Sequence, residues 1–81
     1  MRVTIRLFAR FRELTGASEL LREVRDGATV GAVWEALVSE FPALADYERA
    51  MSAAVNDNYA RLTTHLSDGD EVAFLPPVSG G

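Results

Sequence analysis

The chain has 81 residues, of which 48% are apolar and 25% charged, with a net charge of −4 and no cysteine. This length allows one small domain, and the lack of cysteine excludes disulfides and thiolate metal sites. An acidic chain without a basic cluster is a poor ligand for nucleic acid, and its apolar runs are too short for a membrane-spanning helix. Since the first residues do not resemble a signal peptide, we expect a cytoplasmic protein.

The N-terminal part of the chain alternates between apolar and polar side chains. Residues 3–11 follow a period of two, which predicts a strand with one buried face. Phe8 departs from the pattern, because it puts an aromatic ring on the polar face. Residues 13–16 have the composition of a turn in which Gly16 takes a positive φ. A second strand at residues 18–25 completes the expected hairpin.

Residues 30–41 carry the clearest helical signal. Apolar side chains recur with helical spacing at Val30, Val33, Trp34, Leu37, Val38 and Phe41. Such a stripe forms one face of an amphipathic helix. Thr29 is a suitable N-cap, and Pro42 ends the helix.

The second half of the chain is expected to consist of short elements. They are an irregular helical turn at 43–51 with Tyr47 directed inward, a strand at 52–56, a turn at 56–58, a segment at 59–62 that pairs back, a turn at 68–70 and a last strand at 71–75. In the last strand, Leu75 faces away from Val72 and Phe74.

The element order β-β-α-β-(β)-β predicts an α+β fold. The single main helix must bury its apolar stripe, so we expect it to pack across a mixed sheet of four to five strands. With the last strand returning beside the first, this is the β-grasp arrangement of ubiquitin. The expected domain covers residues 1–75, and residues 76–81 form a flexible tail that ends in Gly-Gly.

Catalytic and metal-binding patterns are absent from the sequence. His65 is the only histidine, and we expect it to be a solvated side chain in a loop. No glycine-rich phosphate loop and no zinc spacing occur, so no metal site is expected. The acidic residues Asp46, Glu48, Asp57, Asp68, Asp70 and Glu71 form either a face for a basic partner or an ordinary solvated face.

The C-terminal tail is the part that points to chemistry. Pro76 and Pro77 lack amide donors and end sheet pairing, and Val78 and Ser79 lead to a terminal Gly80-Gly81. A carboxylate must become a mixed anhydride, such as an acyl-adenylate, before sulfur can attack it. Glycines have no Cβ, so such a tail fits a narrow channel beside ATP, with Gly81 as the covalent carrier. The alternative is a frayed chain end.

Four segments of the chain resemble one known family. Residues 68–81 resemble the C-terminal signature of the small, sulfur carrier subunit of molybdopterin synthase. Residues 8–9, 12–16 and 54–56 are also similar to that family, and the likeness covers essentially the whole chain. The resemblance implies a β-grasp protein without its own catalytic side chains, so the chain alone is not an enzyme.

The resemblance also implies a reaction cycle and two partners. Gly81 is adenylated by an E1-like activating enzyme that uses ATP and is then converted to a thiocarboxylate, a 1-thioglycine; no cofactor is bound tightly. The tail enters the active site of the large synthase subunit, within a heterotetramer. There its sulfur converts cyclic pyranopterin monophosphate to molybdopterin, in the biosynthesis of the molybdenum cofactor.

A partner surface is expected at the root of the tail. Phe8 and Leu75 both lie off the core face by strand parity, and neighbouring first and last strands bring them together. Tyr59, Pro76 and Pro77 extend this apolar patch, which is typical of an interface. The alternative is that Phe8 and Leu75 cover a secondary core. Three other functions stay open: a sulfur carrier for thiamine thiazole, a ubiquitin-like protein modifier, and a plain interaction module.

Overall fold

The computed structural model describes residues 1–77, and residues 78–81 lie outside the described range. Its elements, in chain order, are β1 (Arg2–Leu7), α1 (Arg10–Thr15), β2 (Glu19–Glu23), α2 (Val30–Glu40), the 3-10 helix η1 (Pro42–Tyr47), β3 (Ser52–Val55), β4 (Asn58–Ala60) and β5 (Glu71–Leu75).

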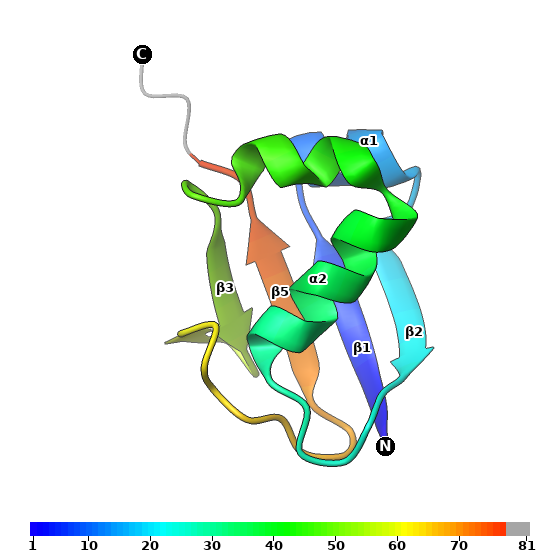
Figure 1. Ribbon diagram of the computed structural model, residues 1–81, viewed down its shortest axis with the longest axis vertical. Coiled ribbons are helices and arrows are strands. Elements are labelled where there is room, and N and C mark those ends of the chain that lie inside the picture. The colour runs from blue at the N-terminus through cyan, green and yellow to red at the C-terminus, as the bar shows by residue number, and fades with distance from the viewer. Residues whose placement is uncertain (78–81) are drawn as a thin grey trace.

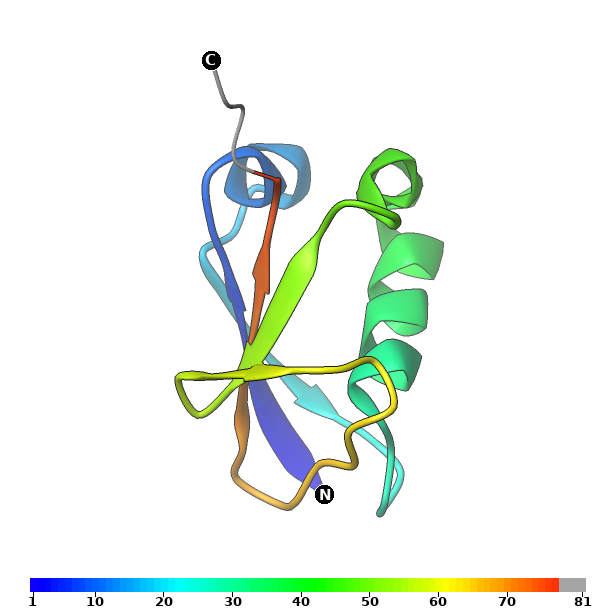
Figure 2. The same ribbon diagram turned by 90° about the vertical axis from the view of Figure 1, so that its left-hand side faces the viewer.

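The five strands form one mixed sheet in the order β2-β1-β5-β3-β4. β1 and β5 are parallel, and the other neighbouring pairs are antiparallel. Helix α2 crosses one face of this sheet, as Figures 1 and 2 show from two sides. This arrangement confirms the predicted β-grasp fold, in which the last strand returns beside the first.

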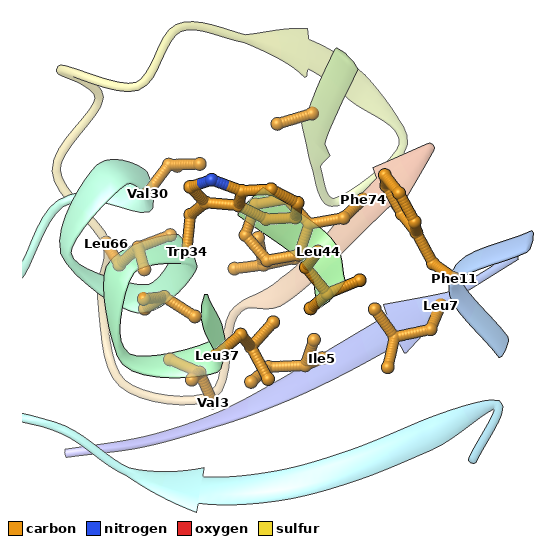
Figure 3. Close-up of a cluster of buried hydrophobic side chains, with 13 residues drawn as sticks. Val3, Ile5, Leu7, Phe11, Val30, Trp34, Leu37, Leu44, Leu66 and Phe74 are labelled. Carbon is orange, nitrogen blue, oxygen red and sulfur yellow. The ribbon is translucent and has the colours of Figure 1, made fainter. Parts of the chain in front are cut away.

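The core lies between α2 and the inner face of the sheet (Figure 3). Its buried side chains are Val3, Ile5, Leu7, Phe11, Val30, Val33, Trp34, Leu37, Leu44, Ala53, Leu66, Val72 and Phe74. The Trp34 ring is central, with its centroid 5.5 Å from that of Phe11 and 5.2 Å from that of Phe74. Burying large aromatic rings is an efficient way for so short a chain to form a core.

Helix α2 agrees with its sequence pattern at both ends. Thr29 Oγ1 accepts a hydrogen bond from Ala32 N at 3.1 Å, which satisfies one of the free amides of the first turn. The helix ends at Glu40, and Pro42 begins η1. Tyr47, at the end of η1, is half-buried, and its ring meets Phe11 edge-on at 5.5 Å, as expected for an inward side chain.

The predicted first strand is too long. β1 ends at Leu7, and Ala9 takes a positive φ of 49°, which turns the chain into helix α1. The alternation at residues 3–11 placed Phe11 on the buried face, and Phe11 is fully buried, but it reaches the core from α1. The sequence continues to alternate through residue 11, so its period could not reveal this turn. Gly16, with φ 75°, caps α1 by donating from its N–H to Arg12 O at 2.8 Å.

The remaining strands differ from expectation mainly in length. β1 and β2 pair antiparallel as predicted, although a helix and not a tight turn joins them. The predicted turn at 56–58 is a two-residue hairpin loop, since Asn56 and Asp57 have φ values of 49° and 71°. β4 is shorter than the predicted segment at 59–62. The predicted strand at 71–75 has the same bounds as β5.

Candidate functional site

The parallel pair β1 and β5 brings two apolar residues to the same end of the sheet. Leu7 lies beside Phe74 in the register of this pair, so both strands finish at one end of the molecule. Figure 1 shows this end at the top, opposite Met1. Phe8 follows directly after β1, and Leu75 is the last residue of β5. Because β1 and β5 are neighbouring strands, Phe8 and Leu75 lie close together.

A shallow hollow of about 240 Å³ lies on the outer face of the sheet at this end. It is lined by Phe8, Ala54, Asp57, Tyr59, Ala73 and Leu75. Within the sheet, Ala54 lies opposite both Ala73 and Tyr59, so small side chains form the floor between larger ones. We call this set of six residues the tail-root hollow.

The walls of the tail-root hollow are accessible to a partner. Tyr59 is 86% exposed and Phe8 38% exposed, while Leu75 is half-buried. Phe8 and Leu75 do not belong to the buried core cluster. The Arg6 guanidinium lies 5.5 Å from the centre of the Phe8 ring, and Arg6 Nη1 is 3.6 Å from Glu71 Oε1. A cation–π contact of this kind favours a fixed position of the Phe8 ring. Arg6 is not among the residues that line the hollow.

Helix α1 adds exposed positive charge at the same end of the molecule (Figure 2). Arg10 and Arg12 are both exposed. Arg10 Nε donates to Tyr47 Oη at 3.4 Å, and this hydrogen bond raises the pKa of Arg10 above its ordinary value. Arg10 Nη1 also lies 3.8 Å from Glu13 Oε2, so the charge of Arg10 is partly balanced within α1.

The other predicted site residues are distributed as follows. Pro76 is half-buried and Pro77 exposed, directly after β5. The four tail residues Val78, Ser79, Gly80 and Gly81 lie outside the described residues. The proposed division into a domain at 1–75 and a tail at 76–81 therefore stays a prediction.

His65 and the acidic residues take no part in the hollow, apart from Asp57. His65 is exposed, and its Nδ1 lies 2.8 Å from Gly27 O. Asp68 accepts from Arg2 N, and Asp70 accepts from Ser67 N, so both carboxylates stabilise loops. In residues 1–77 there is no group of three side chains suited to hold a metal ion. The described helices include none long and apolar enough to cross a membrane.

Sequence reasoning missed Ala54, Asp57 and Ala73 as parts of the hollow. Ala73 lies on the same strand face as Leu75, which the sequence did indicate as a site residue. The position of Ala73 beside Ala54, however, depends on how β3 pairs with β5. That register is fixed by tertiary structure, because the two strands are far apart in the sequence.

The sequence of this chain is similar to that of known proteins. The model of the ThiS family matches residues 5–81. A molybdopterin synthase sulfur carrier subunit from Arabidopsis thaliana is 35% identical over 79 residues, covering 98% of this chain and 82% of that protein. Small archaeal modifier protein 3 from Haloferax volcanii is 37% identical over 92 residues and is covered completely, as is this chain.

Solved structures show the same fold. The crystal structure of SAMP1 from Haloferax volcanii has a TM-score of 0.85 and 33% identity, with both chains fully covered. A complex of subunits 1 and 2 of molybdopterin-converting factor from Helicobacter pylori contains a chain with a TM-score of 0.70 and 27% identity, again with full coverage of both chains.

Proposed function

The chain belongs to the ThiS family, and we propose that it is the sulfur carrier subunit of a molybdopterin synthase. The similarity to sulfur carrier subunits over 98% of the chain is the observation that carries the proposal. Gly80 and Gly81 support it, since the chemistry needs a thin tail and glycines have no Cβ. In this role the chain is not an enzyme by itself, and the reacting side chains belong to its partners.

The proposed chemistry begins at the carboxylate of Gly81. One of its oxygens attacks the α-phosphate of ATP on an E1-like activating enzyme, which releases pyrophosphate and leaves a glycyl adenylate. Sulfur at the sulfide level, as HS⁻ or its equivalent, then attacks the carbonyl carbon, and AMP leaves with the original oxygen. The product is a thiocarboxylate, a 1-thioglycine at position 81. A cytoplasmic location is part of the same proposal, because the activation step consumes ATP.

The second half of the cycle takes place on a large subunit. The thiocarboxylate of Gly81 enters the partner's active site, where its sulfur attacks cyclic pyranopterin monophosphate and forms a thioester. Water then cleaves the bond between this sulfur and the Gly81 carbonyl carbon, so the sulfur stays on the product and the tail returns as a carboxylate. We propose that the tail-root hollow, with Phe8, Tyr59 and Leu75, contacts this large subunit, and that Pro76 and Pro77 direct the tail toward it. The Helicobacter pylori complex of subunits 1 and 2 supports such a pairing, and a heterotetramer is the expected assembly.

A second candidate is a ubiquitin-like protein modifier. The similarity to small archaeal modifier protein 3 favours it, because that protein matches over its whole length. Both functions require the glycyl adenylate, and they differ in the group that attacks it: a sulfur nucleophile or the amine of a target lysine. This chain has no lysine of its own, so it offers no side-chain amine for joining one copy to another. A carrier for thiamine thiazole would use the same adenylate and differ in its acceptor.

Intact-mass spectrometry tests the proposal. The chain is incubated with the activating enzyme, ATP and a sulfur donor, then with the large subunit and cyclic pyranopterin monophosphate. We expect one oxygen to be replaced by one sulfur at Gly81, and the added sulfur to be lost only when both later components are present. An unchanged mass would refute the carrier function. Larger conjugates to lysines of other proteins would favour the modifier, and sulfur loss only to a thiazole synthase would favour the thiamine pathway.

A further inference from the structure

Strand β2 forms an edge of the sheet and has unpaired backbone groups. Its hydrogen bonds with β1 include Val24 N to Met1 O at 2.7 Å and Leu7 N to Ser18 O at 3.0 Å. Hydrogen-bonded residues alternate in an antiparallel pair, so the even-numbered residues 18–24 face β1. The N–H and C=O groups of Glu19, Leu21 and Glu23 therefore point to the open edge.

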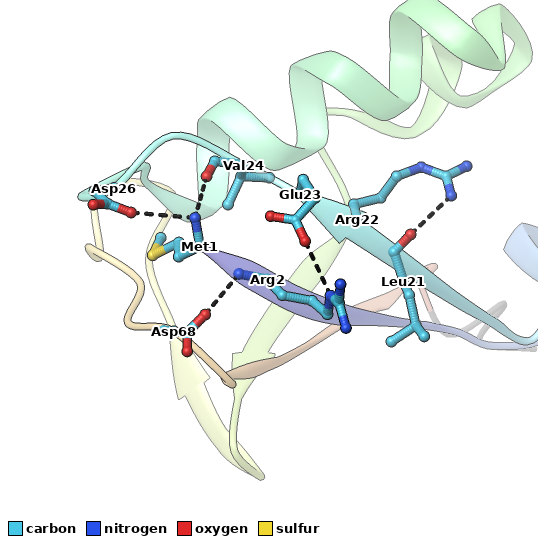
Figure 4. Close-up of polar contacts among 8 residues, drawn as sticks. All are labelled: Met1, Arg2, Leu21, Arg22, Glu23, Val24, Asp26 and Asp68. Carbon is cyan, nitrogen blue, oxygen red and sulfur yellow. Dashed lines mark hydrogen bonds and ion pairs between the residues drawn. The ribbon is translucent and has the colours of Figure 1, made fainter.

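The outer face of β2 has an apolar side chain between two acidic ones. Leu21 is 59% exposed, and Glu19 and Glu23 lie on either side of it on the same face. Glu23 accepts from Arg2 Nε at 3.0 Å, as Figure 4 shows, whereas Glu19 has no ion pair within residues 1–77. An exposed leucine on an open edge is a point where another strand can pair.

The helix side of β2 has a groove. Two adjoining hollows, of about 470 and 120 Å³, share the lining residues Glu23, Val24, Val33 and Ala36 between β2 and α2. Arg22 spans this groove, since its Nη2 lies 2.8 Å from Glu40 Oε1. Arg22 Nη1 also donates a hydrogen bond to Leu21 O at 3.1 Å (Figure 4). This bond uses a carbonyl group of the open edge to which a second strand would otherwise donate.

The charges of the edge disfavour a second copy of this chain. In antiparallel pairing of two β2 strands about Leu21, Glu19 of each copy lies opposite Glu23 of the other. Like charges placed directly opposite in a sheet are destabilising. Glu19, which has no ion pair within residues 1–77, and the exposed Glu23, which shares its charge with Arg2, attract a strand that has basic residues at those positions. Charge complementarity therefore favours a different occupant.

We propose that the open edge of β2 binds an extended segment of a partner protein, in which an apolar residue has a basic residue two positions before it and two positions after it. The apolar residue pairs opposite Leu21, and the basic residues lie opposite Glu19 and Glu23. The two residues between them face the groove beside Val33 and are small and apolar. Arg22 releases the Leu21 carbonyl when the segment binds.

This edge site is separate from the tail-root hollow. β2 and β4 are the two opposite edges of the sheet, and Tyr59 belongs to β4. A segment bound at β2 therefore leaves Tyr59 and Leu75 free, and the site goes beyond the proposed carrier function. A strand added at an edge gains its affinity from backbone hydrogen bonds and its specificity from alternate side chains.

Nuclear magnetic resonance with the peptide acetyl-Lys-Val-Ile-Val-Lys-amide tests the proposal. During titration into the 15N-labelled chain, we expect the amide signals of Glu19, Leu21 and Glu23 to move and their hydrogen exchange to slow. The peptide with the isoleucine nitrogen methylated loses binding, because that N–H faces Leu21 O. The peptide methylated at the second valine is the matched control and binds normally, because that N–H points away from β2.

Charge reversal supplies an independent check. The double variant Glu19→Lys, Glu23→Lys is expected to bind the lysine peptide about tenfold more weakly, and to bind the matching Glu-Val-Ile-Val-Glu peptide better than the parent chain does. Absence of any signal change at millimolar peptide would overturn the proposal. So would changes centred on Phe8 and Leu75, or equal effects of the two methylations.

Discussion

Asn56 joins the β3–β4 hairpin loop to the turn before β5 by a hydrogen bond to Asp70. Asn56 Nδ2 donates to Asp70 Oδ1 at 3.0 Å, and Asn56 Oδ1 accepts from Glu71 N at the same distance. Asp70 also accepts from Ser67 N at 2.8 Å. Two of the segments that carry the family resemblance, around residues 54–56 and 68–71, therefore meet in space and hold the start of β5 in register.

Two substitutions of Asn56 should distinguish the stability that its side-chain hydrogen bonds contribute from the stability that depends on its backbone conformation. Asn56→Gly keeps the positive φ of 49° without strain but loses both bonds, and we expect the free energy of unfolding to fall by about 1–2 kcal/mol. Asn56→Ala should lose about 1 kcal/mol more, because alanine is strained at that φ. Urea unfolding measures both values. If Asn56→Gly were as stable as the parent chain, the bonds to Asp70 and Glu71 would not be stabilising.

The tail-root hollow leads to a prediction about binding. Phe8→Ala should weaken the affinity for the large synthase subunit by about tenfold or more, because aromatic anchors contribute most of the energy of an interface. Its thermal unfolding should change little, since Phe8 lies outside the core cluster. Leu21→Ala removes an exposed apolar side chain at the opposite edge of the sheet and is the matched control. Titration calorimetry should detect no loss for Leu21→Ala, and an equal loss for both variants would contradict the assigned surface.

An element whose apolar pattern repeats over many residues could be predicted from the sequence. An element whose start depends on the φ angle of a single residue could not. The apolar stripe from Val30 to Phe41 extends over about three turns, so α2 and its Thr29 cap could be predicted from the sequence alone. Between residues 8 and 16 the chain contains only one short helix, and its start depends on the φ of Ala9. Phe11 is buried whether it extends a strand or begins a helix, so its burial was predicted correctly although its element was not.

Phe11→Ala should therefore be among the most destabilising single changes in the chain. The side chain is fully buried and contacts the rings of Trp34 and Tyr47. Removing a buried phenylalanine costs about 3–5 kcal/mol, a large part of the roughly 5–15 kcal/mol that stabilises a typical domain. Chemical denaturation should show this loss, and Phe8→Ala is the control with the same change at an exposed ring. A loss below about 1 kcal/mol for Phe11→Ala would contradict its place in the core.

The candidate site was predictable to the extent that it depends on strand parity. Phe8 and Leu75 lie off the core face, and the expected neighbourhood of β1 and β5 placed them together. The floor of the hollow was not predictable, because Ala54 meets Ala73 only through the pairing of β3 with β5. Small side chains such as these give no sequence signal of their own, since alanine occurs in this chain both in the core, at Ala53, and on the exposed surface, at Ala36.

Deleting Gly81 should abolish sulfur transfer without changing the stability of the fold. The core side chains all lie between Val3 and Phe74, so the shortened chain is expected to keep the thermal unfolding midpoint of the parent within about 1 °C. Sulfur transfer should be abolished, because the carboxylate then ends one residue short of the reacting position. Appending one glycine after Gly81 is the complementary variant, which displaces the carboxylate in the opposite direction with a residue of the same type. Both variants should still bind the large subunit through Phe8 and Leu75. Continued sulfur incorporation in the deletion variant, measured by intact mass, would show that the position of the terminal carboxylate is not the requirement proposed here.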